Sequence, residues 1–596
     1  MNFPLKTMAT TSISIDQLVR VATLDELNTK RVIVVQGADR PIAVFANDGQ
    51  PMAVDNRCPH MGFPMHKGSV KQGIVTCHWH EARFDLCSGC TFDLFADDLP
   101  AFDCHVHDGV VFVRPTFRQL ASADYFRNRL ERGMQQNISL IQGKAIIGLL
   151  KSGIGVGEIV RQVAMFGSAN HDNWQAGMTS LTAVANLFDE LDEQTAYFAL
   201  FKGVSQVAGD CAGAAPRRPR HALDTDAHGH GRLKQWMHHW TQVRHRDGAE
   251  RTLLTAINDQ SPGEQLTDVL FSVVTDRPYA NAGHVLDFCN KAIELLALIG
   301  AEHAPAILPL VLSSLVTARG GEEDGAWRHP IDLMGPLREA EAALPSLMEK
   351  AEVGAWQYDE SFGQTILGED PLAIIDALRD AIARGARPQQ LTKHLCYASA
   401  MRLARFALTN DVRDWFSPVH TFTHCNALHQ TVLRCQSPKI VRGIFHAGLA
   451  VYMDRFLNVP PAKLPGERQP LDLAPIDGGE LLRQLLDSLD HRHEVDKAAT
   501  VVARYVRLGH PIRPLVNAMV FAVVREDLDF HALQVIEAGV QQYRLWQEST
   551  GGEGERILVA VTRYLASQCP TRRAGLQTAR IALRLQRGDR IYEDED

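Results

Sequence analysis

Two short motifs near the N-terminus constrain this chain more than any other feature of its sequence. Cys-Pro-His at residues 58–60 is followed, after sixteen intervening residues, by Cys-His-Trp-His at residues 77–80. Thiols and imidazoles are both strong metal ligands, and the glycines at 62, 68 and 73 suit the tight loops that bring such groups together. The pattern therefore predicts a metal site. The alternative is that the four residues match this spacing by chance, or that they bind a zinc ion.

The two motifs resemble the signature of Rieske [2Fe–2S] domains, which is Cys-x-His followed at a fixed distance by Cys-x-x-His. Ala-Arg-Phe-Asp at 82–85, and Leu-Pro at 99–100 before a final strand pair, extend the resemblance. In this family two thiolates hold one iron and two neutral imidazoles hold the other. The resemblance implies a [2Fe–2S] cluster with four ligands: Cys58, His60, Cys77 and His80.

The chain departs from respiratory Rieske proteins, which carry an extra cysteine in each cluster loop, joined as a disulfide. Phe63 and Trp79 occupy those positions here. The resemblance is therefore to the ferredoxin or oxygenase type, and it implies a potential toward the lower end of about −150 to +300 mV. Cys87 and Cys90 have the spacing of a redox pair or a second metal site, but we interpret their segment as a turn.

The residue composition and pattern of the sequence change near residue 116. Before that point the β-branched segments 31–36, 41–46 and 110–115 predict short strands. After it, long stretches rich in Ala, Leu, Arg and Glu predict helices. We therefore expect a multidomain fold, with a small all-β domain over residues 1–116 and a large, mainly α-helical domain over residues 117–596.

Composition excludes several classes of protein. A net charge of −9, from 61 Lys+Arg and 70 Asp+Glu, lacks the basic excess of a nucleic-acid binder. Residues 304–316 are the nearest approach to a membrane span but are too short and contain two prolines, so we expect no membrane segment. Residues 1–16 lack the apolar core of a signal peptide, which favours the cytoplasm. The 11 cysteines are odd in number and unevenly spread, unlike a disulfide scaffold.

The later part of the chain does not match the standard ring-hydroxylating Rieske oxygenases, which bind a mononuclear iron through two His and one carboxylate. His424 and His429 have the required spacing, but Thr421 stands where the carboxylate belongs and the surrounding sequence is too helical. This part instead resembles the questin oxidase-like family, through segments 283–294, 419–430, 442–461 and 527–537. Those helical proteins are associated with oxidative ring opening of polyketides, and the resemblance implies a His-ligated non-heme iron.

Four histidines on separate predicted helices are the candidate ligands of that iron: His284, His420, His446 and His531. His420 and His424 stand at i, i+4, a spacing that lets two imidazoles on one helix face reach one metal. His446 lies in a segment whose composition predicts burial nearly all round, so it needs a polar partner in any case. For each of these histidines, a packing role is the alternative.

Polar neighbours of these histidines share their helix faces. Asp527 and Gln534 fall on the face of His531 and are expected to orient it. Asp287 and Lys291 follow His284 at i+3 and i+7 along one edge of a predicted helix, and Glu294 continues the stripe. We interpret Asp287 and Lys291 as candidate catalytic proton donors beside a metal ligand. A solvated polar face is the alternative.

Together these patterns predict an oxygenase. The [2Fe–2S] cluster would relay single electrons from an external reductase or ferredoxin, through His60 or His80, to a mononuclear non-heme Fe(II). That iron would activate O2 on a small organic substrate, polycyclic or natural-product in kind. The Gly-rich segment 153–157 lacks the strand and acidic partner of a dinucleotide site, which weakens a flavin- or nicotinamide-assisted monooxygenase and favours a separate reductase. A homo-oligomer is expected by analogy only.

The rival is an electron-transfer or redox-sensing protein whose helical part binds a partner and holds no metal. Exposed apolar patches with a charged rim would favour that rival. A deep pocket lined by imidazoles would favour the enzyme.

Overall fold

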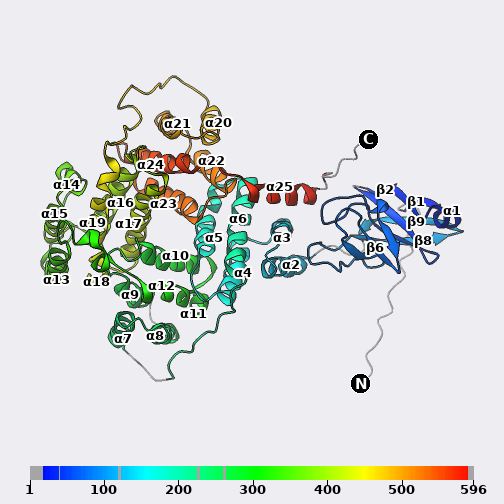
Figure 1. Ribbon diagram of the computed structural model, residues 1–596, viewed down its shortest axis with the longest axis horizontal. Coiled ribbons are helices and arrows are strands. Elements are labelled where there is room, and N and C mark those ends of the chain that lie inside the picture. The colour runs from blue at the N-terminus through cyan, green and yellow to red at the C-terminus, as the bar shows by residue number, and fades with distance from the viewer. Residues whose placement is uncertain are drawn as a thin grey trace. The chain divides into compact units, whose positions relative to one another are not determined.

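The computed structural model describes residues 18–38, 40–117, 122–224, 229–259, 263–587 and 589. Residues 1–16, on which the expected cytoplasmic location rests, lie outside this range. The chain divides into two compact units, one made of Met1–Ile154 with Gln577–Asp596 and the other of Gly155–Leu576. Strands occur in the first unit and the second is helical, so a β-rich N-terminal domain precedes a large α-helical region, as predicted (Figure 1).

The first unit is built on a six-stranded antiparallel sheet in the order β1-β9-β8-β4-β3-β2. Its strands are β1 (Val19–Thr23), β2 (Val32–Gln36), β3 (Pro41–Asn47), β4 (Gln50–Asp55), β8 (Ala101–His107) and β9 (Val110–Phe117). A second antiparallel sheet holds β5 (Ser69–Lys71), β6 (Ile74–Thr76) and β7 (Arg83–Asp85). The three strands that the sequence predicted correspond to β2, β3 and β9.

Local sequence explains the hairpins and the burial of this sheet. Asp-Gly pairs at 48–49 and 108–109 join β3 to β4 and β8 to β9, and all four residues have positive φ, as a two-residue hairpin turn requires. Along β3, Ala43 and Phe45 pack on the side of the two cysteine motifs, while Ile42 and Val44 pack in a second apolar cluster. Both faces of the strand are therefore buried, which explains its continuous apolar sequence.

The first unit also contains the helices α1 (Leu24–Lys30), α2 (Ala123–Gln135) and α3 (Ser139–Lys151), together with most of α25 (Ala574–Arg587). The helices that follow up to residue 317 are α4 (Val156–Asn170), α5 (Ala176–Leu187), α6 (Glu193–Cys211), α7 (His230–Gln242), α8 (Arg246–Asn258), α9 (Gly263–Val274), α10 (His284–Ile299), α11 (Ala304–Ile307) and α12 (Leu312–Thr317).

The remaining helices complete the chain. They are α13 (Met334–Lys350), α14 (Glu360–Ile366), α15 (Pro371–Ala383), α16 (Pro388–Ala404), α17 (Phe416–Arg434), α18 (Pro438–Val441), α19 (Gly443–Met453), α20 (Gly478–Leu489), α21 (Val495–Arg507), α22 (Ile512–Val524), α23 (Phe530–Trp546) and α24 (Glu553–Gln568). Short 3₁₀ turns are η2 (Met65–Lys67), η3 (Phe188–Glu190), η4 (Ala301–His303), η5 (Leu308–Val311), η6 (Gly321–Glu323), η7 (Gly325–Trp327), η8 (Val412–Trp415) and η9 (Asp454–Asn458).

One described segment, Ala301–Glu323, has the length and apolar composition of a membrane-spanning helix. The expectation from sequence considered only residues 304–316, whereas the helical segment extends further at both ends. It is divided into short α and 3₁₀ pieces, and Leu308, Val311 and Leu312 are fully buried. A buried core helix passes the same test, so this one segment is weak evidence for a membrane span.

Helix α17 occupies a central place in the second unit, because it packs against α10 and α23. It begins at Phe416, two residues before Pro418. A proline in the first turn costs no hydrogen bond, because the first N–H groups of a helix have no partner within it. This start places His420 more than one turn inside the helix.

Candidate metal centres

The two cysteine motifs lie in loops that make the same backbone turn. The N–H of Cys58 donates to the carbonyl of Phe63 (2.8 Å), and the N–H of Gly62 donates to the carbonyl of Cys58 (2.7 Å). The second loop repeats both bonds around Cys77, at 2.9 Å each. The residue four positions after each cysteine has positive φ, 85° at Gly62 and 60° at Glu81. Two matching turns thus present the two motifs in the same way.

The four predicted cluster ligands come together. Cys58 and Cys77 are buried, and the rings of His60 and His80 lie 4.9 Å apart. The buried Nδ1 of His60 has no hydrogen-bond partner among the described residues, as expected of an atom whose partner is a metal. Burial, and then the charges of His80 and Lys144, lower the pKa of His60 to about 4, so its lone pair is available at pH 7. These residues fit a [2Fe–2S] cluster.

The two cysteine thiols are close enough to share a hydrogen bond. That bond raises the pKa of Cys58, with burial adding to the effect, and lowers the pKa of Cys77 to about 6. One thiolate is therefore favoured before any iron binds. Iron binding requires both cysteines as thiolates.

The surroundings of the two histidines differ. His60 is partly covered by Phe95, whose ring lies 5.0 Å away, whereas His80 is exposed beside Trp79. Trp79 also lies 6.1 Å from Phe63, so aromatic packing occurs where respiratory Rieske proteins have a disulfide. Of the two predicted electron-transfer ligands, His80 is therefore the one at the surface of the first unit.

A buried cation braces the first cluster loop, and the sequence analysis missed it. The ammonium of Lys144, on α3, donates to the carbonyl of Pro59 and lies 3.0 Å from Oδ2 of Asp97. Arg129, on α2, holds the other oxygen of Asp97 at 3.0 Å. Lys144 lies inside an apolar helix, Ser139–Lys151, whose other charged residue is Lys151 at its end, and this isolated interior charge is the local signal that could have found it.

The Cys87–Cys90 segment is the turn that the sequence predicted. The carboxylate of Asp85 accepts from the N–H of Cys87 (3.3 Å) and of Ser88 (2.9 Å). Both cysteines are exposed.

In the second unit, three histidines could hold a single metal ion. Of the residues that the structure describes, only His284, His420 and His531 have ligand atoms all within 4.8 Å of one another. The Nε2 atoms of His420 and His531 are 2.9 Å apart, and the rings of His284 and His420 are 4.3 Å apart. Two nitrogens at about 2.1 Å from one ion and at right angles to each other are about 3 Å apart. This pair already has that separation; a hydrogen bond between the two imidazoles is the alternative.

The protonation of this histidine group suits metal binding. Burial lowers the pKa of His284 to about 4, and the charge of His531 acts in the same direction. Burial, with the charges of His284 and His531, lowers the pKa of His420 to about 2. Both imidazoles are therefore neutral at pH 7, and only the neutral ring offers a lone pair to a metal.

Asp529 lies beside the ring of His531. It is the N-cap of α23 and accepts the N–H of His531 at 3.1 Å. Its Oδ1 also lies 3.0 Å from Nδ1 of that ring, a contact that lacks hydrogen-bond geometry. A carboxylate on Nδ1 leaves Nε2 free to bind a metal. The sequence assigned this role to Asp527, which instead accepts the backbone N–H groups of Ala574 and Gly575. An Asp just before a helix is a common N-cap, and this signal could have identified Asp529.

The backbone before His284 is strained. Tyr279, Asn281 and Ala282 have φ near +50°, and Gly283 has φ of +88°. A Cβ at Gly283 would lie 2.8 Å from the Cβ of His424, so only glycine fits without displacement. Such conformations cost about 1–3 kcal/mol each and persist where the surrounding structure enforces them. Here they place His284 at the first residue of α10.

His446 and His424 do not join the group of three. Nε2 of His446 lies 2.7 Å from Oε1 of Glu341, which gives this buried ring the polar partner it needs. Neither ring nitrogen of His424 has a hydrogen-bond partner among the described residues, and burial lowers its pKa to about 3. Both rings line a cavity of about 10 Å³, room for about one water. The i, i+4 pair His420 and His424 is thus not brought to one ion.

The two predicted proton donors differ in chemistry. Asp287 and Lys291 are both buried, so the alternative of a solvated polar face is wrong. Thr423 donates to Oδ2 of Asp287 (2.8 Å), and burial raises the pKa of that carboxyl to about 7. Burial alone would lower the pKa of Lys291, but Glu294 and Glu537 raise it above its usual value. Asp287 can therefore gain and lose a proton near neutral pH, while Lys291 stays charged.

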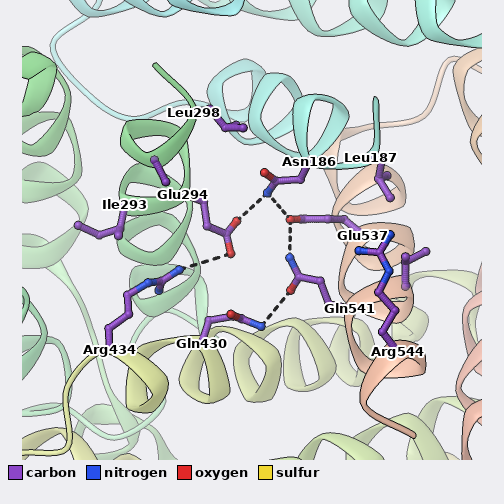
Figure 2. Close-up of a pocket in the computed structure, with 12 residues that line it drawn as sticks. Asn186, Leu187, Ile293, Glu294, Leu298, Gln430, Arg434, Glu537, Gln541 and Arg544 are labelled. Atoms are coloured by element: carbon purple, nitrogen blue, oxygen red, sulfur yellow. Dashed lines mark hydrogen bonds and ion pairs between the residues drawn. The ribbon is translucent and has the colours of Figure 1, made fainter. Parts of the chain in front are cut away.

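A larger pocket opens further along the same helices (Figure 2). It encloses about 300 Å³, and its described lining residues include no histidine. They are Asn186, Leu187, Ile293, Glu294, Ala297, Leu298, Gln430, Arg434, Glu537, Val540, Gln541 and Arg544. Figure 2 shows the amide of Asn186 between the carboxylates of Glu294 and Glu537, contacts that no local sequence pattern indicated.

Known proteins are similar in sequence to the N-terminal part of this chain. The family described as Rieske [2Fe-2S] domain matches residues 17–107. The ferredoxin component of the naphthalene 1,2-dioxygenase/salicylate 5-hydroxylase systems of Ralstonia sp is 31% identical over 71 residues, 12% of this chain and 68% of the ferredoxin. The chain belongs to the Rieske [2Fe–2S] family through this domain. The Rieske domain thus carries the predicted cluster.

Two other proteins are similar over the Rieske domain alone. The 4beta-methylsterol monooxygenase of Methylococcus capsulatus is 36% identical over 66 residues, which are 11% of this chain and 18% of the enzyme. This chain thus matches less than a fifth of that enzyme. The solved ferredoxin of carbazole 1,9a-dioxygenase from Nocardioides aromaticivorans IC177 is 25% identical and covers 17% of this chain and 99% of its own, with a TM-score of 0.16. The helical region carries no family assignment, so its resemblance to questin oxidase-like proteins gains no support.

Proposed function

We propose that this chain is a Rieske-linked non-heme iron oxygenase. In this proposal the [2Fe–2S] cluster supplies single electrons and an iron held by His284, His420 and His531 supplies oxygen activation on an organic substrate. The overall balance is RH + O2 + 2e⁻ + 2H⁺ → ROH + H2O, with the electrons from an external reductase or ferredoxin. The histidines would position the ion, and the carboxylate of Asp529 beside Nδ1 of His531 would orient that ring.

One observation carries the proposal: the 2.9 Å separation of the Nε2 atoms of His420 and His531, with His284 beside them. Three imidazoles on one side of an ion would leave positions open for O2 or substrate, as in non-heme iron sites with a facial set of three ligands. Here the third ligand is an imidazole rather than the usual carboxylate. The dioxygenase-system ferredoxin and the sterol monooxygenase among the relatives support coupling of this Rieske type to oxygenation.

The test is the content of iron and acid-labile sulfide per chain in anaerobically purified protein. We expect three irons and two sulfides in the wild type, and two irons with an unchanged cluster spectrum in His420→Ala. His446→Gln is the matched control, because His446 is a buried histidine outside the group and should leave three irons. Two irons in the wild type, after supply of Fe(II), would contradict the proposal.

The second candidate is an electron-transfer or redox-sensing protein whose helical region holds no metal. It is favoured by the cavities: neither the 300 Å³ pocket nor the 10 Å³ cavity is lined by a residue of the histidine group. The match over 68% of a ferredoxin component is also consistent with it. The iron count separates the two candidates, since this one requires only the two irons of the cluster.

Several expectations remain part of the proposal. These are the boundary between residues 116 and 117, the cytoplasmic location, a small organic substrate and a homo-oligomer. His446 as an iron ligand is set aside in favour of its pairing with Glu341.

A further inference from the structure

Three helices place polar side chains at successive turns beyond the histidine group. Asp287, Lys291 and Glu294 follow His284 on α10; Gln534, Glu537 and Gln541 follow His531 on α23; Thr423, Asn426 and Gln430 follow His420 on α17. We call these nine residues the polar seam. On α10 the distance along the helix from His284 to the last seam residue, Glu294, is about 15 Å at 1.5 Å per residue. It begins at the candidate metal site and ends at the pocket of Figure 2.

The middle of the seam is a buried charge group formed by Lys291, Glu294 and Glu537. The ammonium of Lys291 lies 2.6 Å from Oε2 of Glu294 and also contacts Oε2 of Glu537. Two carboxylates and one ammonium leave one negative charge uncompensated, and a buried net charge costs several kcal/mol. Arg434 lies 4.0 Å from Glu294 and offsets part of this negative charge. One proton bound to the group neutralises the rest of the charge.

The proton belongs on Glu537. Burial raises the pKa of Glu537 to about 7, although Lys291 opposes the shift. Burial would also raise the pKa of Glu294, but Lys291 and Arg434 keep it below its usual value. The charged groups that face Glu537 are Lys291 and Glu294 from α10, with Arg434 of α17 beyond them, while Arg544 on its own helix pairs with Glu190. Of the two carboxyls, Glu537 is thus the one that titrates near neutral pH.

The pocket gives this group access to water. Glu294 and Glu537 both line it, and the amide of Asn186 donates to Oε2 of Glu294 (3.1 Å) and to Oε1 of Glu537 (2.6 Å). Gln541 donates to the same oxygen of Glu537 at 3.0 Å. A partly open pocket of about 300 Å³ with these polar walls holds several waters. The carboxyl of Glu537 is therefore within reach of solvent protons, although the residue is only 1% exposed.

Asp287 stands between this group and the histidines. It lies one helical turn after His284 and one before Lys291 on α10, and Thr423 and Gln534 contact its carboxyl. Oε1 of Gln534 is buried and has no hydrogen-bond partner in the described structure. Buried polar atoms of this kind usually bind an ordered water. A water at Gln534, which precedes Glu537 by one turn on α23, would bridge Glu537 to Asp287.

We propose that Glu537, within its group with Lys291 and Glu294, takes up a proton from pocket water and delivers it through Asp287 to the histidine group. The proton leaves the Glu537 carboxyl for the Asp287 carboxylate by way of the bridging water, and Glu537 is reprotonated from the pocket. Net transfer is one proton per cycle, and two cycles meet the two protons that each oxygenation consumes. The inference rests on the proposed function, because that reaction creates the demand for protons at a buried site.

The first test follows reoxidation of the reduced protein by O2, with no organic substrate. Full-length protein loaded with Fe(II) carries one electron on the cluster and one on the iron, enough for O2 + 2e⁻ + 2H⁺ → H2O2. Cluster absorption is followed in H2O and in D2O. We expect Glu537→Gln and Asp287→Asn each to slow reoxidation about 100-fold, the lower range for loss of a positioned proton donor. The wild-type rate should fall as the pH rises above about 7, since the donors are then deprotonated.

Glu190→Gln is the matched control, because Glu190 pairs with Arg544 at the pocket but lies outside the seam. Its rate should equal that of the wild type. Wild-type rates and isotope effects in both seam variants would overturn the inference. If His420→Ala slows reoxidation while the seam variants do not, only the proton route fails. If His420→Ala has no effect on reoxidation or iron content, the proposed function fails.

A second test needs neither iron nor turnover. Infrared spectra of the metal-free protein should show protonated-carboxyl absorption that titrates near pH 7, and Glu537→Gln and Asp287→Asn should each remove a part of it. Absence of such a band in the wild type would overturn the inference even if the variants fail to fold.

Discussion

The Nε2 atoms of His420 and His531 lie 2.9 Å apart, although 111 positions separate the two residues in the chain. Each belongs to a different helix, α17 or α23, and Oδ1 of Asp529 lies 3.0 Å from the other ring nitrogen of His531. Two imidazoles that face each other in this way either share one proton or bind one ion. His284, at the start of α10, completes a set of three and favours the ion.

Replacing Asp529 by Asn should weaken metal binding at the histidine group. Asn keeps the N-cap hydrogen bond of α23 but loses the negative charge beside Nδ1 of His531. Partners of this kind contribute about 10–100-fold to metal affinity, so we expect a loss of that size in titrations with Co(II) or Fe(II). Asp527→Asn is the control and should bind as the wild type does. Equal affinities in both variants would contradict the role given to Asp529.

Replacing Lys144 by Met should lower the reduction potential of the Rieske cluster. Lys144 brings a buried positive charge to the carbonyl of Pro59, between two cluster ligands, and a nearby cation favours the reduced state. Asp97 offsets part of that charge. We therefore expect a decrease on the order of 1 kcal/mol, about 40 mV for one electron, in a potentiometric titration followed by EPR.

Lys144→Arg keeps the charge and is the matched control for that titration. It should keep the potential close to that of the wild type. A potential in Lys144→Met that is unchanged or higher would show that Lys144 only supports the loop.

Replacing Gly283 by Ala should destabilise the helical region and displace His284. The new Cβ would lie 2.8 Å from the Cβ of His424, at a φ of +88° that alanine rarely adopts. We expect a loss of about 2–4 kcal/mol in the free energy of unfolding, from backbone strain and overpacking together, and weaker metal binding. Denaturant unfolding and metal titration measure the two effects.

Gly552→Ala separates the contact from the backbone conformation. Gly552 also precedes a helix with positive φ, 77°, but a Cβ there would meet nothing within 4 Å. Its cost should be about 1 kcal/mol, without effect on metal binding. Equal costs for the two alanines would show that the His424 contact is unimportant.

Acid should destabilise the metal-free protein through His424. Its pKa is lowered to about 3 in the folded state, whereas an unfolded histidine titrates near pH 6.5. Below pH 6.5 the unfolded chain therefore binds more protons, and stability falls with pH until about pH 3. His424→Phe should remove about 3 kcal/mol of the loss between pH 6.5 and pH 4, measured by denaturant unfolding. His239 is exposed, so His239→Asn is the control and should leave the dependence of stability on pH unchanged. The same unchanged dependence in His424→Phe would contradict the prediction.

The cluster site was predictable because its ligands lie in two short motifs. Turns around Cys58 and Cys77 are local structures, so the spacing of the motifs indicates a metal site, and their resemblance to Rieske domains implies the cluster. The seam was only partly predictable. Its α10 stripe follows from helix periodicity, but the partner of Lys291 on α23, Glu537, is 246 positions away and no local pattern connects them. Asp529 was missed in favour of Asp527, because the start of α23 at Phe530 was not recognised.

The sequence by itself determined the Rieske domain, its four cluster ligands, the helical character of the rest and a short set of candidate histidines. These depend on interactions within a few residues of chain. Only the tertiary structure decided that His284, His420 and His531 meet while His446 turns to Glu341. The physical reason is that the packing of α10, α17 and α23 depends on apolar contacts spread along whole helices, whereas a helix's own sequence specifies only which residues share a face.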